Sequence, residues 1–259
     1  MRLRPPRPCW LAVILSTAFV CANAKAEEVT VAVAANFTAP MQKIAQAFEQ
    51  DTGHKAKLVF GSTGKFYAQI KNGAPFAVLL SADVETPARL EQEGAAVAGT
   101  RFTYAVGRLA LWSKNPALVD NKGQVLLSNT TDKNSFKKLA IADPKLAPYG
   151  TAAIEVIEGM GASAKVMTKL VQGDSIGQAF QFVMTENAEL GFVAYSQIST
   201  DGRITQGSAW VVPQNLYTPL RQDAALLSLG KDNAAALALI KYMRTDRAKT
   251  IIRTYGYTL

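Results

Sequence analysis

Short apolar runs rich in β-branched residues alternate along most of the chain with stretches whose apolar residues recur every three or four positions. In 174–188, for example, Ile176, Ala179, Phe180 and Val183 share one helical face. This alternation predicts the α/β class, with helices layered on sheets. The predicted strands are 29–34, 56–60, 76–82, 108–114, 138–143, 190–196 and 208–213. The predicted helices are 40–51, 63–71, one beyond residue 87, 148–161, 174–188, 233–244 and one more before the C-terminus, and 121–135 is expected to be loop.

The first residues have the composition of a secretory signal peptide. Three arginines precede an apolar run at 9–21, and small residues follow it. The run is too short to span a bilayer. Cleavage after Ala24 or after Ala26 fits, and we expect removal of 1–26 by the ordinary Sec route, which predicts a periplasmic protein.

Charge and residue counts exclude several classes of function. Without 1–26 the chain keeps 24 Lys and Arg against 20 Asp and Glu, a net charge of +4, with no basic run that would indicate nucleic-acid binding. Both cysteines lie in the removed segment, and His54 is the only histidine. Thiol catalysis and multi-histidine metal sites are therefore excluded, and no cofactor is expected.

Four places share one local design, in which a strand ends, a small or polar turn follows and a helix begins. They lie at 33–38, 59–70, 142–153 and 171–179. Such a turn leaves unpaired backbone N–H groups at the positive end of a helix dipole, where an anion can bind. Helix capping alone would also explain each turn. The sequence GSTGK at 61–65 has the wrong spacing for a nucleotide-binding P-loop.

Taken in order, these turns make the chain resemble the periplasmic molybdate-binding proteins of molybdenum ABC importers. The resemblance covers 27–259 and rests on VAVAANFTAPMQKIAQAFE, VFGSTGKFYAQI, NGAPFAVLLSAD, IADPKLAPYGTAAIEV, ELGFVAYS and YGYTL. It implies a two-lobed periplasmic binding protein fold of type II, with two hinge strands crossing between lobes. Lobe I would comprise 27–105 and 215–259, and lobe II would comprise 106–214.

The resemblance also implies the ligand and its contacts. Molybdate or tungstate would bind between the lobes of a monomer and pass to a membrane permease, with no enzymatic reaction. Asn36 stands where the family usually has serine, and Thr63 supplies the second-turn hydroxyl, with Ser62 as a one-residue alternative. The backbone N–H groups of Tyr149 and Ile176 complete the set.

A fifth contact stays open. Many members supply a tyrosine hydroxyl from the strand that matches GFVAYS, but Ala194 stands at that position and Tyr195 follows it. Adjacent residues of a strand point to opposite faces, so Tyr195 is either a ligand or a core or rim residue.

Four other functions remain as alternatives: binding of phosphate, sulfate or ferric iron, and hydrolysis. A set of pure donors rejects protonated anions, which disfavours phosphate, while sulfate differs from molybdate in size. Asp174 is the candidate acceptor for a phosphate proton but is a better helix N-cap. Isolated Tyr149 and Tyr195 make a ferric-iron site less favourable. An exported hydrolase would have to use Ser62 with Lys65.

Overall fold

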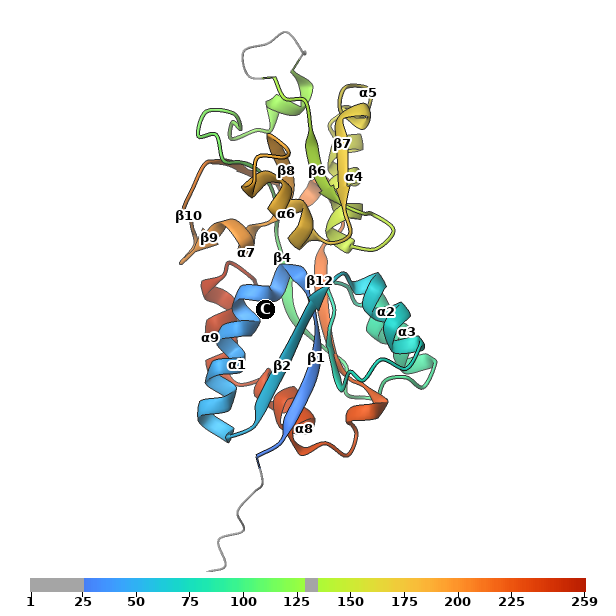
Figure 1. The fold of residues 1–259 in the computed structure, drawn as a ribbon. Helices are drawn as coiled ribbons and strands as arrows, with labels where there is room; N and C mark the ends of the chain where they lie inside the picture. Colours follow the sequence, from blue (N-terminus) through green and yellow to red (C-terminus); the bar gives the residue numbers. More distant parts are fainter. Residues whose placement is uncertain (1–25, 129–134) are drawn as a thin grey trace, which may run out of the picture.

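The computed structural model describes residues 26–128 and 135–259, which form two α/β lobes joined at a narrow waist (Figure 1). The predicted signal peptide, except Ala26, lies outside these residues, as does 129–134 of the expected loop. The lobes confirm the predicted α/β class and two-lobed architecture.

The sheet of the first lobe has the order β2-β1-β3-β12-β4. Strand β1 runs parallel to β2 and β3, whereas β12 is antiparallel to β3 and β4. Helices α1, α8 and α9 pack against one face, and α2 and α3 lie on the other. The strands are β1 (Glu28–Ala34), β2 (Lys55–Gly61), β3 (Val78–Leu80), β4 (Phe102–Gly107) and β12 (Leu220–Leu226). The helices are η1 (Ala35–Phe37), α1 (Thr38–Thr52), α2 (Thr63–Lys71), α3 (Glu85–Gln92), η5 (Ser228–Gly230), α8 (Ala234–Tyr242) and α9 (Asp246–Thr254).

The sheet of the second lobe has the order β11-β5-β8-β6-β7. Its strands are β5 (Leu109–Ser113), β6 (Leu139–Ala142), β7 (Leu170–Gly173), β8 (Leu190–Ala194) and β11 (Ser208–Val211), and a hairpin adds β9 (Ser199–Thr200) and β10 (Arg203–Ile204). Its helices are η2 (Gln124–Leu127), α4 (Pro148–Gly159), α5 (Ser163–Val166), η3 (Met167–Lys169), α6 (Ile176–Met184), α7 (Tyr195–Ile198) and η4 (Gln214–Leu216).

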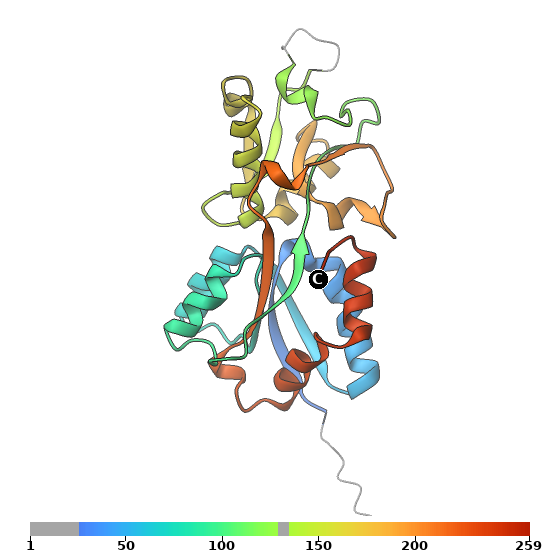
Figure 2. The same ribbon diagram turned by 180° about the vertical axis from the view of Figure 1, so that it is seen from behind.

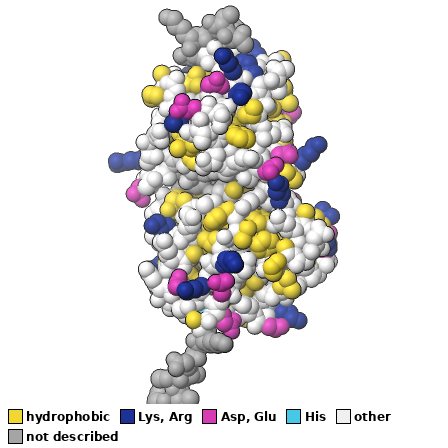
Figure 3. Space-filling view, viewed as in Figure 1, with side chains coloured by type: hydrophobic (Ala, Val, Ile, Leu, Met, Phe, Trp, Pro, Cys, Tyr) yellow, Lys and Arg dark blue, Asp and Glu magenta, His cyan; other side chains and the backbone are white. Residues whose placement is uncertain are grey.

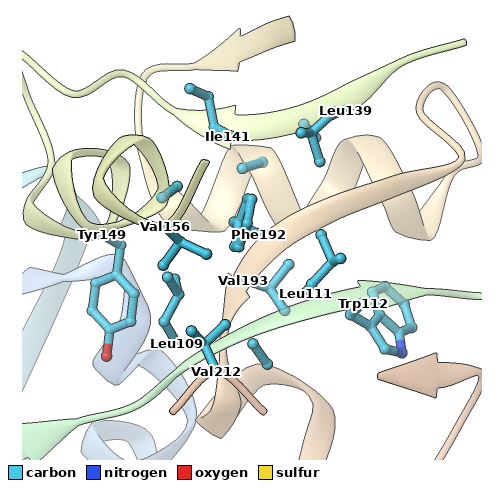
Figure 4. Packing of buried hydrophobic residues seen from close by; sticks show 14 of the residues in the cluster. Leu109, Leu111, Trp112, Leu139, Ile141, Tyr149, Val156, Phe192, Val193 and Val212 are labelled. Carbon is cyan, nitrogen blue, oxygen red and sulfur yellow. The ribbon is translucent and has the colours of Figure 1, made fainter. Parts of the chain in front are cut away.

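Each lobe has its own apolar core. In the second lobe, residues of β5, β6 and β8 pack against α4, and Trp112 is 1 % exposed (Figure 4). In the first lobe, Phe37, Met41 and Phe48 are buried beneath the sheet's strands. Burial of such side chains supplies most of the driving force for folding. The core of the second lobe also includes Ala34, Ala35 and Ala82 of the first lobe, so small apolar side chains pack across the waist beside its polar contacts.

The chain crosses between the lobes in two places, after β4 and before β12 (Figure 2). The first crossing is Arg108, between Gly107 and Leu109, and the second is the segment 212–219. The lobe boundaries expected at 105/106 and 214/215 remain a prediction.

Several elements differ from the sequence-based expectation. Strands β4, β7 and β12 were not predicted. Strand β8 ends at Ala194, and Tyr195 begins the short helix α7, so the alternation of strand faces does not extend to Tyr195. Among the described residues, no helix has the length and apolar character needed to cross a membrane.

Candidate functional site

The four turns identified in the sequence meet in one small pocket at the waist. It is lined by residues of both lobes, including Asn36, Ser62, Thr63, Tyr149 and Ile176. Every lining residue is uncharged. A larger groove between α1, α9 and the β9–β10 hairpin is lined by several charged side chains, including Lys43, Asp201 and Arg247, and contains none of the four turns. The convergence of four turns, rather than volume, identifies the candidate site.

Ordinary capping does not account for most of these turns. Helices α1, α2 and α4 have no side-chain hydrogen bond at their N-caps. In α6 the cap is Ser175, whose Oγ accepts from the N–H of Gln178 at 3.3 Å. The expectation that Asp174 caps this helix was therefore wrong, because its carboxylate pairs with Lys65 instead. Three of the four helix starts thus have no side-chain cap, which leaves the N–H groups of their first turns without a capping side chain.

Asn36, in the first turn, is 2 % exposed and is held from several sides. Its Nδ2 donates to Gln222 Oε1 at 2.8 Å and to the Tyr257 hydroxyl at 3.0 Å. Its carbonyl oxygen accepts from the hydroxyls of Ser196 and Tyr257, both at 2.8 Å. Because both amide hydrogens have protein acceptors, the backbone N–H is the donor that Asn36 offers to a ligand. Its buried Oδ1 has no hydrogen-bond partner among the described residues.

In the second turn, Ser62 and Thr63 are both buried but differ in their partners. Thr63 Oγ1 accepts from the N–H of Ala82 at 3.0 Å and lies 3.3 Å from Ser81 Oγ. Within the described chain, Ser62 Oγ has no hydrogen-bond partner although it is buried. A buried hydroxyl without a partner is unusual in a native protein and indicates a ligand or water there. Both hydroxyls therefore stay candidates.

The third and fourth turns offer main-chain groups. Tyr149 and Ile176 lie in the first turns of α4 and α6, where N–H groups have no acceptor within the helix. Their side chains belong to the core of the second lobe. Gly150 allows the first turn of α4 to pack closely against the end of β6. A Cβ at this position would lie 2.3 Å from the carbonyl oxygen of Ala142, the last residue of β6.

Ala194 and Tyr195, the candidates for a fifth contact, do not line the pocket. The Tyr195 hydroxyl donates to the carbonyl oxygen of Gly202 at 2.8 Å, and its ring lies against the Arg108 guanidinium. Ala194 is fully buried at the end of β8. The structure brings together the other five candidates and leaves these two outside.

The tyrosine hydroxyls around the pocket stay protonated over the physiological pH range. Burial raises the pKa of the Tyr257 hydroxyl to about 12. It also raises the pKa of the Tyr149 and Tyr104 hydroxyls well above the ordinary value. The tyrosines therefore keep their protons and add no negative charge beside an anion.

The pair Ser62 and Lys65 is not arranged for hydrolysis. Lys65 Nζ lies 2.5 Å from Asp174 Oδ2 at the exposed rim, and no hydrogen bond joins it to Ser62. A Ser-Lys mechanism needs the amine within hydrogen-bond reach of the hydroxyl. The geometry gives no support to the hydrolase alternative.

Three residues that support the site were not identified from the sequence. Ser196, Gln222 and Tyr257 hold Asn36 from α7, from β12 and from the C-terminal tail. Gln222 and Ser196 are residue types that usually lie at the surface. The β12 sequence does not alternate between apolar and polar residues, so it did not indicate a strand. The YGYTL tail was part of the resemblance, but nothing in it indicated a role for Tyr257.

Comparison with known proteins agrees with this geometry. The sequence profile described as bacterial extracellular solute-binding protein matches residues 29–258. The chain belongs to this family. Its two-lobed α/β fold agrees with this membership.

Curated relatives of this solute-binding protein include two that carry the name molybdate-binding protein ModA. One, from Azotobacter vinelandii, is 56 % identical over 96 % of this chain and 97 % of its own length. The other, from Rhodobacter capsulatus, is 50 % identical over 95 % of this chain and 93 % of its own. A solved structure, the periplasmic molybdate-binding protein of Azotobacter vinelandii, superimposes with a TM-score of 0.84 at 39 % identity, covering 89 % of this chain and 99 % of that one.

Proposed function

We propose that the chain is a periplasmic solute-binding protein that captures molybdate, and also tungstate, and delivers it to the membrane permease of an ABC importer. Two relatives of at least 50 % identity are named for molybdate binding. The observation that carries the proposal is the pocket where four helix-starting turns of both lobes meet without a charged side chain. The protein is a binding protein, not an enzyme.

The proposed contacts are hydrogen bonds from neutral donors. They are the backbone N–H groups of Asn36, Thr63, Tyr149 and Ile176 and the hydroxyls of Ser62 and Thr63. A hydrogen bond to a charged group contributes about 1.5–3 kcal/mol net. Six such bonds, less the cost of ordering and desolvation, suffice for sub-micromolar affinity. Helix dipoles add to this stabilisation without a counter-ion.

Contacts between the lobes close the pocket. The N–H of Gly64, in α2, donates to the carbonyl oxygen of Leu146, in the second lobe, at 2.9 Å. Ser196 of α7 bonds Asn36 across the same waist. We infer that the protein acts as a monomer in which ligand binding stabilises this closed arrangement.

Calorimetric titration of the chain freed of ligand tests the proposal. Molybdate and tungstate should bind tightly with 1:1 stoichiometry, while sulfate and phosphate should give little heat. Thr63→Ala removes one hydroxyl and should weaken molybdate binding roughly 10-fold. Equal affinity for sulfate would assign the protein to another oxyanion, and absence of binding to all four anions would refute the proposal.

A further inference from the structure

Gln222 is a fully buried amide in β12, the strand that enters the first lobe from the second crossing. Its neighbour Asp223 is also buried, but that carboxylate is paired with Arg101 and bonded to Thr103 at the edge of the sheet. A buried amide needs several hydrogen-bond partners to offset its loss of water. The partners of Gln222 lie at the candidate site.

The two ends of this amide bond residues from opposite lobes. Oε1 accepts from Asn36 Nδ2 at 2.8 Å and lies 3.0 Å from the Tyr104 hydroxyl, both in the first lobe. Nε2 donates to the Tyr149 hydroxyl, in the second lobe, at 3.3 Å. Figure 4 shows that this hydroxyl points away from the apolar core around Val156 and Phe192. One side chain therefore connects the first and third turns of the pocket.

A glycine leaves the room for this connection. Gly107 ends β4 and pairs with Leu220 of β12. A Cβ at this position would lie 2.1 Å from the Tyr149 hydroxyl and 2.6 Å from Gln222 Nε2. Any side chain at 107 would displace the two groups that meet there. This observation is independent of the hydrogen bonds and points to the same three-residue arrangement.

We propose that Gln222 is a positioning residue of the anion site, which holds the Asn36 and Tyr149 turns in register when the lobes close. The proposal rests on the proposed function and adds to it the residue that couples ligand binding to closure. Gln222 does not line the pocket, so it acts through Asn36 and Tyr149. Breaking its bonds frees the two turns to move apart, and the donors on them then no longer converge on one anion.

The test compares molybdate affinity in the full mature chain and three variants, with thermal unfolding of each ligand-free protein measured in parallel. Gln222→Leu keeps the volume and removes both hydrogen bonds, so molybdate should bind roughly 10- to 100-fold more weakly. Gly107→Ala keeps every polar group and displaces the contact, so affinity should fall in the same direction. Gln92→Leu, at an exposed position of α3, is the matched control and should bind like the wild type.

Gln222→Glu adds the pH dependence of molybdate affinity as a second readout, compared at each pH with thermal unfolding of the same ligand-free variant. In mildly acidic buffer the protonated carboxyl can accept from Asn36 and donate to Tyr149, so affinity should approach that of the wild type. In mildly alkaline buffer the carboxylate stands beside a bound dianion, and affinity should collapse. The wild-type affinity should stay flat over the same range. Because the acidic form retains both bonds, this variant keeps the test valid if Gln222→Leu does not fold.

The outcomes separate the two proposals. A wild-type chain that binds no oxyanion overturns the proposed function and this inference with it. A wild-type chain that binds molybdate, with Gln222→Leu and Gly107→Ala within twofold of it, overturns the inference alone. The inference also fails if Gln222→Glu follows the flat wild-type pH profile. Weaker binding by folded Gln222→Leu, with a pH-dependent Gln222→Glu, supports it.

Discussion

The two halves of the pocket present their hydrogen-bond donors in different ways. In the first lobe, the second turn offers the buried hydroxyls of Ser62 and Thr63, while Asn36 offers its backbone N–H and its buried side chain is held by neighbours. In the second lobe, Tyr149 and Ile176 offer main-chain N–H groups while their side chains pack into the core. One half therefore depends on residue types, and the other depends on where two helices begin. A change of side chain should therefore alter molybdate affinity more in the first lobe than in the second.

The surface outside the pocket differs again from both halves. On the face shown in Figure 3, Lys and Arg side chains are scattered over both lobes and do not gather at the waist. The lining of the candidate site holds no charged side chain, and the exposed Lys65 and Asp174 pair with each other. On the proposed function, recognition would therefore rest on neutral donors rather than on a charged side chain in the pocket.

The largest effect is expected from a new charge in the first half. Asn36→Asp replaces the buried amide with a carboxylate beside the anion. Two like charges about 4 Å apart repel by about 4 kcal/mol at an effective dielectric constant of about 20, which corresponds to roughly 1,000-fold weaker molybdate binding. Calorimetry at fixed ionic strength measures this loss. Asn121→Asp, at an exposed position, is the matched control, and equal affinity of the two variants would exclude Asn36 from the site.

In the second half, removing a main-chain donor should matter more than changing a side chain. Ile176 is the first residue of α6, a position where proline fits, and Ser175 before it is extended at φ −150° and ψ 164°. Ile176→Pro deletes the N–H and should weaken molybdate binding about 10- to 100-fold. Ile176→Val keeps the N–H and should bind like the wild type. Similar affinities for the Pro and Val variants would show that this N–H does not contact the anion.

A smaller effect is expected where the halves touch. A Cβ on Gly64 would lie 3.1 Å from Leu146 Cα and carbonyl oxygen, so Gly64→Ala resists full closure. Molybdate affinity should fall several-fold. The free energy of unfolding should not fall with it, because alanine stabilises α2 by up to about 1 kcal/mol relative to glycine. Denaturant unfolding and calorimetry on the same sample separate the two effects, and a parallel loss of both would contradict this view of closure.

The elements that carry the four turns could be predicted because their local signals agree. In the first turn, the buried run of β1 is followed at once by helical spacing, and α2 begins and ends where the sequence predicts. The prediction that these turns form one site came from finding four similar turns in order along the chain. The fold brings them together, and each turn alone is indistinguishable from an ordinary helix start.

The residues behind the site could not be predicted, for a physical reason. Strand β12 is nearly all buried, yet Arg221, Gln222 and Asp223 interrupt its apolar pattern. Their partners lie more than 100 positions away in the sequence, at Thr103, Asn36 and Arg101. From the sequence alone, a polar residue is predicted to be exposed unless its distant hydrogen-bond partner is known. Tyr195 was uncertain for a related reason, since β8 ends one residue before it and the strand alternation no longer applies.

The smallest effect is expected at the rim, where Lys65 and Asp174 join the two lobes through an exposed ion pair. The two side chains are 44 % and 63 % exposed, and pairs of this kind contribute about 0–1 kcal/mol. Lys65→Gln should therefore change molybdate affinity by less than about threefold. Any difference should shrink as salt is added, because exposed charges are screened. Calorimetry at low and high ionic strength measures this. A large, salt-insensitive loss would mean that Lys65 contacts the anion directly and that recognition does not rest on neutral donors alone.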